Sequence, residues 1–194
     1  FSTIYGVYVF AGTLLGFLAF LLLTGQFLNG KGALNGVVTV EHYHDIGRLV
    51  FAFTIFWAYI SFSQYFLIWY GNLPEETLWY LHRWEGSWKV FSMLLLFGHF
   101  IVPFLALMLR VVKRNMLLLR ALAVWILAMH WIDVYWLIGP ALHHETAHLS
   151  WMDLTAFVGV GGIFMGLYFR QLASKPLVPE GDPRLLNSIE FTHH

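Results

Sequence analysis

The chain has 194 residues, of which 59% are hydrophobic, 19% aromatic and only 11% charged. Water-soluble domains contain about 45–50% apolar and about 25% charged residues, so this composition excludes an ordinary soluble fold and predicts a multi-pass membrane protein. Eleven basic residues balance eleven acidic ones, so no net positive charge favours nucleic acid as a partner. The sequence has no cysteine, which excludes disulfides, thiolate zinc sites, cysteine-held iron–sulfur clusters and thioether-attached c-type haem.

Five apolar stretches approach or exceed the length of about 20 residues that a transmembrane helix needs. They cover residues 4–28, 49–70, 90–109, 117–138 and 154–172. No segment shows the alternating pattern of a strand, so the sequence predicts an all-α helical bundle over residues 1–175, followed by a polar tail over 176–194. Pro103 is expected to kink the third span. Because the chain opens at Phe1 without Met, we expect it to be a fragment of a longer protein.

The basic residues are distributed unevenly between the two sides of the predicted bundle. Nine of the eleven fall on the side of the link between the third and fourth spans, and only Arg83 and Lys89 fall on the other. Cytoplasmic loops are enriched in Lys and Arg, so the N-terminal end is expected outside and the tail in the cytoplasm. Two pairs of small residues, Gly12 with Gly16 and Gly162 with Gly166, predict close packing between helices.

The first polar cluster stands at the start of the second span and comprises His42, His44, Asp45 and Arg48. Helical spacing brings Asp45 within reach of both His42 and Arg48. One interpretation is a helix start that its acidic residues stabilise, and the other is a mouth for proton uptake, because histidine titrates near neutral pH. The sequence favours neither interpretation over the other.

The second cluster lies deeper in the membrane. His99 falls in the middle of the third span, and His130 and Asp133 share one face of the fourth. Ionisable groups inside a bilayer are costly, and an imidazole beside a carboxylate favours a proton relay over a merely structural hydrogen bond. The alternative of bis-histidine haem ligation is less favoured, because His99 is central and His130 is displaced outward.

A third motif, at residues 144–148, reads H-E-x-x-H. On a helix, His144 and His148 would bind zinc with Glu145 as general base, which makes a membrane zinc hydrolase a distant alternative. The motif follows Gly139 and Pro140 in a short outward link rather than in a span, so its structural context is missing.

The stretch SFSQYFLIWYGNLPEET at 61–77 is distinctive, as is HYHDIGR at 42–48. With DVYW at 133–136 and SWMD at 150–153, they resemble the NrfD/PsrC-type integral membrane subunits. The closer resemblance is to the ActF-type subunit of bacterial alternative complex III, a quinol:cytochrome c (electron acceptor) oxidoreductase, and the chain is similar to its C-terminal portion.

This resemblance implies a place in the bacterial cytoplasmic membrane beside a paralogous NrfD-like subunit. Haem and iron–sulfur clusters are expected on partner subunits, and no cofactor is expected to be covalently bound here. The implied role is a transmembrane proton route coupled to quinol oxidation elsewhere in the complex. Quinone or quinol binding, with menaquinone as one candidate, is the runner-up.

Residues of the second span and of the loop that follows it complete the prediction. Tyr59, Ser63, Gln64 and Tyr65 are candidates for lining a quinone site or a water path. Glu75, Glu76 and Arg83 form a charged outer loop that we expect to dock an extrinsic subunit. Protons are expected to enter near His42, His44 and Asp45, to pass His99, and to leave through His130 and Asp133. A polar group such as Tyr59, or water, has to bridge the gap between Asp45 and His99.

Overall fold

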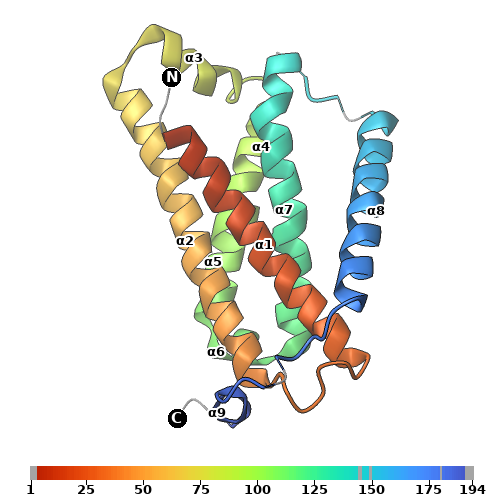
Figure 1. Cartoon of the computed structure of the whole chain (residues 1–194). Helices are drawn as coiled ribbons and strands as arrows, with labels where there is room; N and C mark the ends of the chain where they lie inside the picture. The colour runs from red at the N-terminus through yellow and green to blue at the C-terminus, as the bar shows by residue number, and fades with distance from the viewer. Residues whose placement is uncertain (1–3, 144–145, 149, 180, 191–194) are drawn as a thin grey trace.

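The structure is a computed structural model that describes residues 4–143, 146–148, 150–179 and 181–190. Helices account for its regular elements over these ranges (Figure 1). Five helical spans are long and apolar enough to cross a membrane, which confirms the predicted all-α, multi-pass architecture. They are Ile4–Gly30, Val40–Gly71, Trp88–Met108, Met116–Leu142 and Trp151–Ala173.

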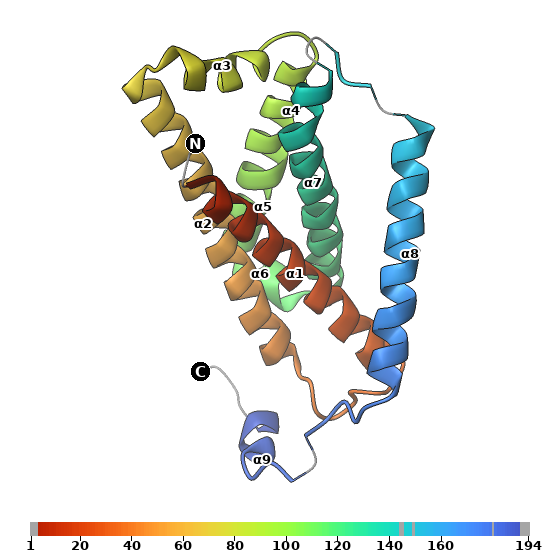
Figure 2. The same ribbon diagram turned by 45° about the horizontal axis from the view of Figure 1, so that its top comes forward.

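The spans run alternately up and down the bundle (Figure 1). The first is α1 (Ile4–Gly30) and the second is α2 (Val40–Gly71), which begins nine residues before the predicted apolar stretch. A short helix, α3 (Pro74–His82), then crosses one end of the bundle between α2 and α4 (Figure 2). We call this end the α3 end.

The third span has three parts: α4 (Trp88–Leu94), the π-helical segment η1 (Leu95–Ile101) and α5 (Val102–Met108). The predicted irregularity at Pro103 therefore takes the form of a π-helical segment directly before it. The basic helix α6 (Arg110–Arg114) connects this span to α7 (Met116–Leu142) and marks the opposite end of the bundle, which we call the α6 end.

The core of the bundle forms where α1 lies across α2 and α7 (Figure 1). The side of α1 that faces them carries Ala11, Leu15, Ala19 and Leu22, all almost fully buried. Small side chains at helical spacing let the backbones of neighbouring helices approach closely, and in a bilayer such packing replaces the hydrophobic effect as the driving force.

The last span, α8 (Trp151–Ala173), stands apart from this core (Figures 1 and 2). None of residues 151–173 is buried, and the described contacts of α8 with the bundle include ring contacts such as Phe20 with Phe164 and Trp131 with Phe157. A Cβ atom added to Gly162 or Gly166 would meet nothing within 4 Å. The predicted close packing at this glycine pair is therefore wrong within this chain, because the face that carries the pair has no helix against it.

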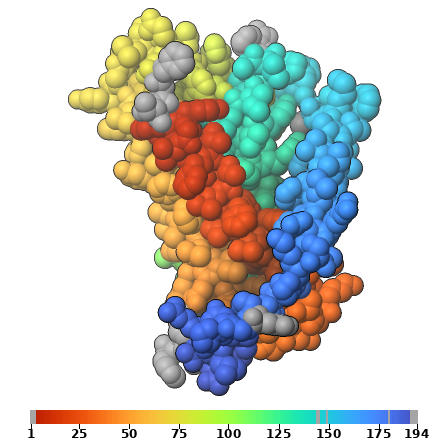
Figure 3. Space-filling model, viewed as in Figure 1, coloured from red at the N-terminus to blue at the C-terminus, as the bar shows by residue number. Residues whose placement is uncertain are grey.

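The segment after α8 returns to the α6 end and carries the short helix α9 (Leu185–Ile189). Figure 3 shows this segment lying over the α6 end of the molecule. Ser188 of α9 lies 3.2 Å from Nε2 of His42, so the tail contacts the start of α2.

Candidate functional site: a buried carboxyl group and the polar groups at both ends

Asp133 of α7 is enclosed at the point where α1, α2 and α7 meet, with 1% of its surface exposed. Its two oxygens have different donors. The Tyr8 hydroxyl of α1 donates to Oδ1, and Nε1 of Trp57 of α2 donates to Oδ2 over 3.2 Å. A tyrosine hydroxyl both donates and accepts hydrogen bonds, so Tyr8 gives the carboxyl group a partner through which a proton can be exchanged.

His130 lies one helical turn from Asp133, against the glycine face of α1. A Cβ atom added to Gly12 would lie 3.2 Å from Cε1 of His130, and one added to Gly16 would lie 3.0 Å from Cδ2. At such distances, a side chain at either position would require the His130 ring to shift. The predicted contact at Gly12 and Gly16 is confirmed, and its partner is the imidazole ring of His130.

His99 of the π-helical segment completes the buried group. Its ring stacks on Trp57 with centroids 4.1 Å apart and an interplanar angle of 7°. The Met129 backbone lies within reach of this ring, yet neither ring nitrogen has a hydrogen bond of ordinary geometry within the described residues. The site thus brings together two imidazoles, one indole, one phenol and one carboxyl group from α1, α2, η1 and α7.

The rings of His99 and His130 meet edge to face with centroids 6.5 Å apart. The expected difference in membrane depth between these two histidines is therefore wrong, because α7 packs against η1 in a register that brings His130 opposite His99. Neither histidine lines the large cavity described below, so that cavity gives no support to haem ligation by the pair.

The π-helical geometry around His99 has a local cause. In a π-helix the N–H of a residue bonds to the carbonyl five residues earlier, as Val102 does with Phe97. The next such donor would be Pro103, which has no N–H. The Gly98 carbonyl instead accepts a hydrogen bond of 2.8 Å from Nε1 of Trp125 on α7. This bond ties the His99 segment to the helix that carries His130 and Asp133.

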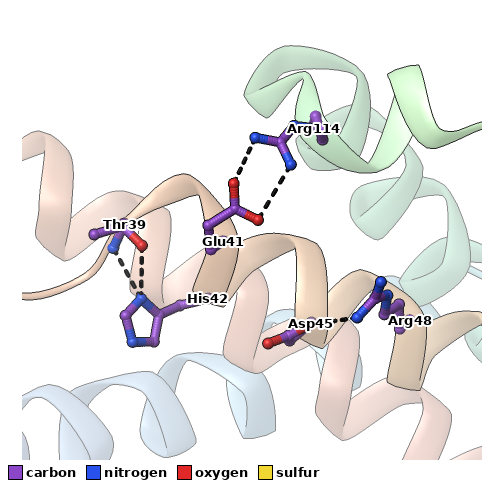
Figure 4. A network of polar contacts seen from close by, with 6 residues as sticks. All are labelled: Thr39, Glu41, His42, Asp45, Arg48 and Arg114. Atoms are coloured by element: carbon purple, nitrogen blue, oxygen red, sulfur yellow. Dashed lines mark hydrogen bonds and ion pairs between the residues drawn. The ribbon is translucent and has the colours of Figure 1, made fainter. Parts of the chain in front are cut away.

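The cluster at the start of α2 divides into three separate contacts (Figure 4). Glu41 forms a bidentate ion pair with Arg114 of α6, with oxygen–nitrogen distances of 2.5 and 3.1 Å. Nδ1 of His42 faces Thr39, 3.1 Å from its backbone nitrogen and 2.9 Å from its hydroxyl, in a capping box. Asp45 pairs with Arg48 over 3.2 Å.

Both ring nitrogens of His42 thus face Thr39 and Ser188, whereas the helical spacing predicted a contact with Asp45. The remaining member of the cluster, His44, is 98% buried. The capping box supports the interpretation of this cluster as a stabilised helix start, and it leaves the proton-uptake interpretation open.

The cluster at the start of α2 and the Asp133 site are separated along α2 by mostly apolar packing. Asp45 and Trp57 are twelve residues apart, which corresponds to about 18 Å at about 1.5 Å per residue. The buried polar side chain nearest to Trp57 in this interval is Thr54, whose hydroxyl is bonded to the Val50 carbonyl. Tyr59 follows Trp57 towards the α3 end and is 64% exposed, so the suggestion that Tyr59 bridges this gap is wrong.

Towards the α3 end, by contrast, Tyr8 and Trp57 border a cavity of about 860 Å³. Three of the four predicted quinone or water-path residues, Tyr59, Gln64 and Tyr65, line it, and Ser63 does not. Most of the other lining side chains are aromatic or aliphatic, and Ser92 and Arg83 contribute polar groups. Pockets of about 300–1,000 Å³ with apolar walls and a few polar groups are typical of small-molecule sites.

The three residues expected to dock an extrinsic subunit lie in different environments. Glu75 is exposed and Glu76 is half-buried in the first turn of α3. Arg83, which follows α3, is only 4% exposed and is turned into the bundle, so its guanidinium is not presented on the outer surface. Burial lowers the pKa of Arg83 to about 10, so the group keeps its charge at neutral pH.

The H-E-x-x-H motif falls in the link between α7 and α8. His144 and Glu145 lie outside the described residues, and His148 is exposed and not in a helix. Its Nε2 lies 2.8 Å from the Thr146 hydroxyl. Within the described residues, no group of three or more His, Asp or Glu side chains is arranged to hold a metal ion.

Tyr8 and Trp57 are the members of the candidate site that sequence reasoning missed. Tyr8, Gly12 and Gly16 recur at intervals of four residues and therefore lie on one stripe of α1. A single hydroxyl in line with two glycines was the available signal that this stripe faces a polar group. Trp57 gave no such signal, because an indole in a membrane helix is usual.

A comparison of the chain with models of known protein families found no match, and neither did a comparison with curated protein sequences.

Proposed function

We propose that this chain is an integral membrane subunit of a bacterial quinol:cytochrome c (electron acceptor) oxidoreductase complex and carries a proton route coupled to quinol oxidation. The observation that carries the proposal is the Asp133 carboxyl group, buried between three helices and bonded to Tyr8 and Trp57. Ionisable side chains are costly to bury in a membrane, and those that lie inside a helical bundle mark ion and proton pathways.

The direction of the route follows from the two sides of Asp133. Tyr8 connects the carboxyl group to the cavity at the α3 end, so proton exchange with that side is direct. On the other side, a proton from His42, His44 or Asp45 has to cross the packed segment around Val50 and Thr54, which requires transient hydration. The α6 end carries most of the basic residues and is proposed to face the cytoplasm.

The family and partners belong to the same proposal. The motifs at 42–48 and 61–77 resemble the ActF-type, NrfD-like subunits, whose complexes hold haem and iron–sulfur clusters on other subunits. A helix such as α8, with no buried residue within the chain, is consistent with membership of a larger assembly. Glu75 and Glu76 at the α3 end are the proposed contacts for an extrinsic subunit.

The test is quinol-driven proton translocation by the whole complex in liposomes, with the Asp133→Asn variant. Asparagine has nearly the same shape but cannot release a proton, so translocation should be lost while electron transfer continues. Asp153→Asn is the matched control, because Asp153 is exposed and caps α8. Unchanged translocation in Asp133→Asn, in a correctly assembled complex, would exclude a route through this residue.

Quinol binding is the second candidate function, and the aromatic cavity at the α3 end favours it. Gln64 is 95% buried and lines this cavity, whereas its neighbour Ser63 does not. A quinol that binds here should lose affinity in Gln64→Leu and keep it in Ser63→Ala. Equal quinol affinity in the two variants would contradict quinol binding at this place.

A further inference from the structure

Arg83 is a buried cation whose charge is not matched by a carboxylate. Its side chain is enclosed between α3 and α7, where Nη1 donates to the Trp79 carbonyl over 2.9 Å and Nη2 to the Leu137 carbonyl over 2.8 Å. Among the described residues, its Nε has no hydrogen-bond partner and no Asp or Glu forms an ion pair with it.

Aromatic rings hold the guanidinium in place. Its carbon lies 3.4 Å from the centroid of the Trp79 ring and 5.1 Å from that of Trp136. Stacking on ring faces stabilises a cation by about 0.5–2 kcal/mol, which offsets only part of the cost of burying a charge. A buried guanidinium with carbonyl and ring partners alone is therefore a strong site for an anion.

The same guanidinium borders the large cavity at the α3 end. The walls of this cavity are mostly aromatic and aliphatic, so an inorganic anion alone would leave them unfilled. Several lining side chains are also exposed on the outside of the bundle, such as Tyr59, Phe62 and Leu96. In a membrane-spanning chain, this outer surface faces the bilayer or a neighbouring subunit, so a ligand can enter from the lipid phase.

We infer that the cavity binds an acidic amphiphile, with its anionic head on Arg83 and its acyl chain along the aromatic wall formed by residues such as Tyr65 and Tyr80. A phospholipid phosphate and a fatty-acid carboxylate share this chemistry. Arg83 borders the same cavity as Tyr8, but it makes no described contact with the Asp133 carboxyl group proposed to carry protons.

The test is photolabelling of the whole purified complex in phosphatidylcholine nanodiscs, with phosphatidylglycerol that carries a diazirine in its acyl chain. The expected labels fall on peptides that cover residues 55–69 and 79–96. Unlabelled phosphatidylglycerol should compete and phosphatidylcholine should not. If oleate also competes, the cavity binds any acidic head group on an acyl chain. If oleate does not compete, the cavity requires the phospholipid phosphate. Both results support the inference.

Variants separate the role of Arg83 from that of the fold. Arg83→Gln should reduce labelling about tenfold, as the loss of one charge-assisted hydrogen bond predicts. Lys89→Gln, which removes an exposed cation from the same end of the bundle, should leave labelling unchanged. If Arg83→Gln does not assemble, Ala58→Leu keeps the test, because it fills part of the cavity and retains the guanidinium.

Three results would overturn the inference. Equal labelling by a phosphatidylcholine probe would show that the cavity accepts any lipid. A neutral quinone that competes as well as phosphatidylglycerol would show that the acidic head is irrelevant. Wild-type labelling in an assembled Arg83→Gln complex would show that the guanidinium does not hold the ligand.

Discussion

The Asp133 carboxyl group on α7 is bonded to the Tyr8 hydroxyl on α1, although the two residues are 125 positions apart in the chain. This bond joins α1 to α7, two of the three helices that meet in the core. It makes Tyr8 the link between the buried carboxyl group and the cavity at the α3 end, since Tyr8 also lines that cavity.

The first prediction concerns this link. Tyr8→Phe keeps the ring and removes the only described donor to Oδ1 of Asp133, which leaves one buried oxygen unsatisfied. We expect the free energy of unfolding to fall by about 1–3 kcal/mol and proton translocation to slow. Thermal unfolding of the detergent-solubilised complex and translocation in liposomes measure the two effects.

The control for Tyr8→Phe is Tyr5→Phe, on the same helix. Tyr5 lies one helical turn before Tyr8, is 41% exposed and has no described hydrogen bond to Asp133. Equal loss of translocation in both variants would show that the effect comes from α1 as a whole and not from the bond to Asp133.

The second prediction tests the glycine face of α1. In Gly16→Ala, the new methyl group would lie 3.0 Å from Cδ2 of His130, so the ring has to move. Overpacking of this kind costs about 1–3 kcal/mol, and we expect a lower temperature of thermal unfolding. Gly6→Ala is the matched control, because a Cβ atom at Gly6 meets nothing within 4 Å. Comparable stability of the two variants would contradict the close contact between α1 and His130.

Much of the fold was predictable because its determinants are local. Apolar stretches of sufficient length predict the five spans, and small residues at helical spacing predict the side of α1 that packs closely. The apolar stretch predicted for the second span begins nine residues after α2 does, because hydropathy does not register the polar first turns of the helix. Its actual start depends on the capping box of Thr39 and His42.

The site was predictable only in part, because its geometry depends on the register between distant helices. His99, His130 and Asp133 were singled out as costly residues in a membrane, and the structure brings all three together with Trp57. Their relative depth was misjudged, since the depth of a residue in an apolar stretch does not determine how neighbouring spans align. The cavity at the α3 end depends on how α3 lies across α2 and α4, which no local pattern encodes.

The third prediction concerns the ion pair that joins α2 to α6. Glu41 is 92% buried, whereas the Arg114 side chain is 37% exposed, so Glu41→Gln removes the charge from the buried side of a partly enclosed pair. We expect a loss of about 1–3 kcal/mol in the free energy of unfolding. In the exposed pair of Asp45 with Arg48, Asp45→Asn should cost at most about 1 kcal/mol. Denaturation of both variants at low and high salt measures this difference, and equal losses would contradict it.

The fourth prediction concerns the hydrogen bond that holds the π-helical segment. Trp125→Phe removes the donor to the Gly98 carbonyl, and Pro103 has no N–H that could replace it. We expect this variant to destabilise the protein by about 1–2 kcal/mol. Pro103→Ala restores a backbone N–H in the position to bond to that carbonyl. In the Pro103→Ala background, the loss caused by Trp125→Phe should therefore be smaller.

This double-mutant cycle isolates the bond from the loss of the indole ring itself. Trp131→Phe on the same helix is the control for ring loss, because the Trp131 ring is partly exposed and makes ring contacts with Tyr135 and Phe157. If Trp125→Phe costs the same in both backgrounds, the Gly98 carbonyl is satisfied in another way. The π-helical geometry around His99 would then need a different cause from the missing N–H of Pro103.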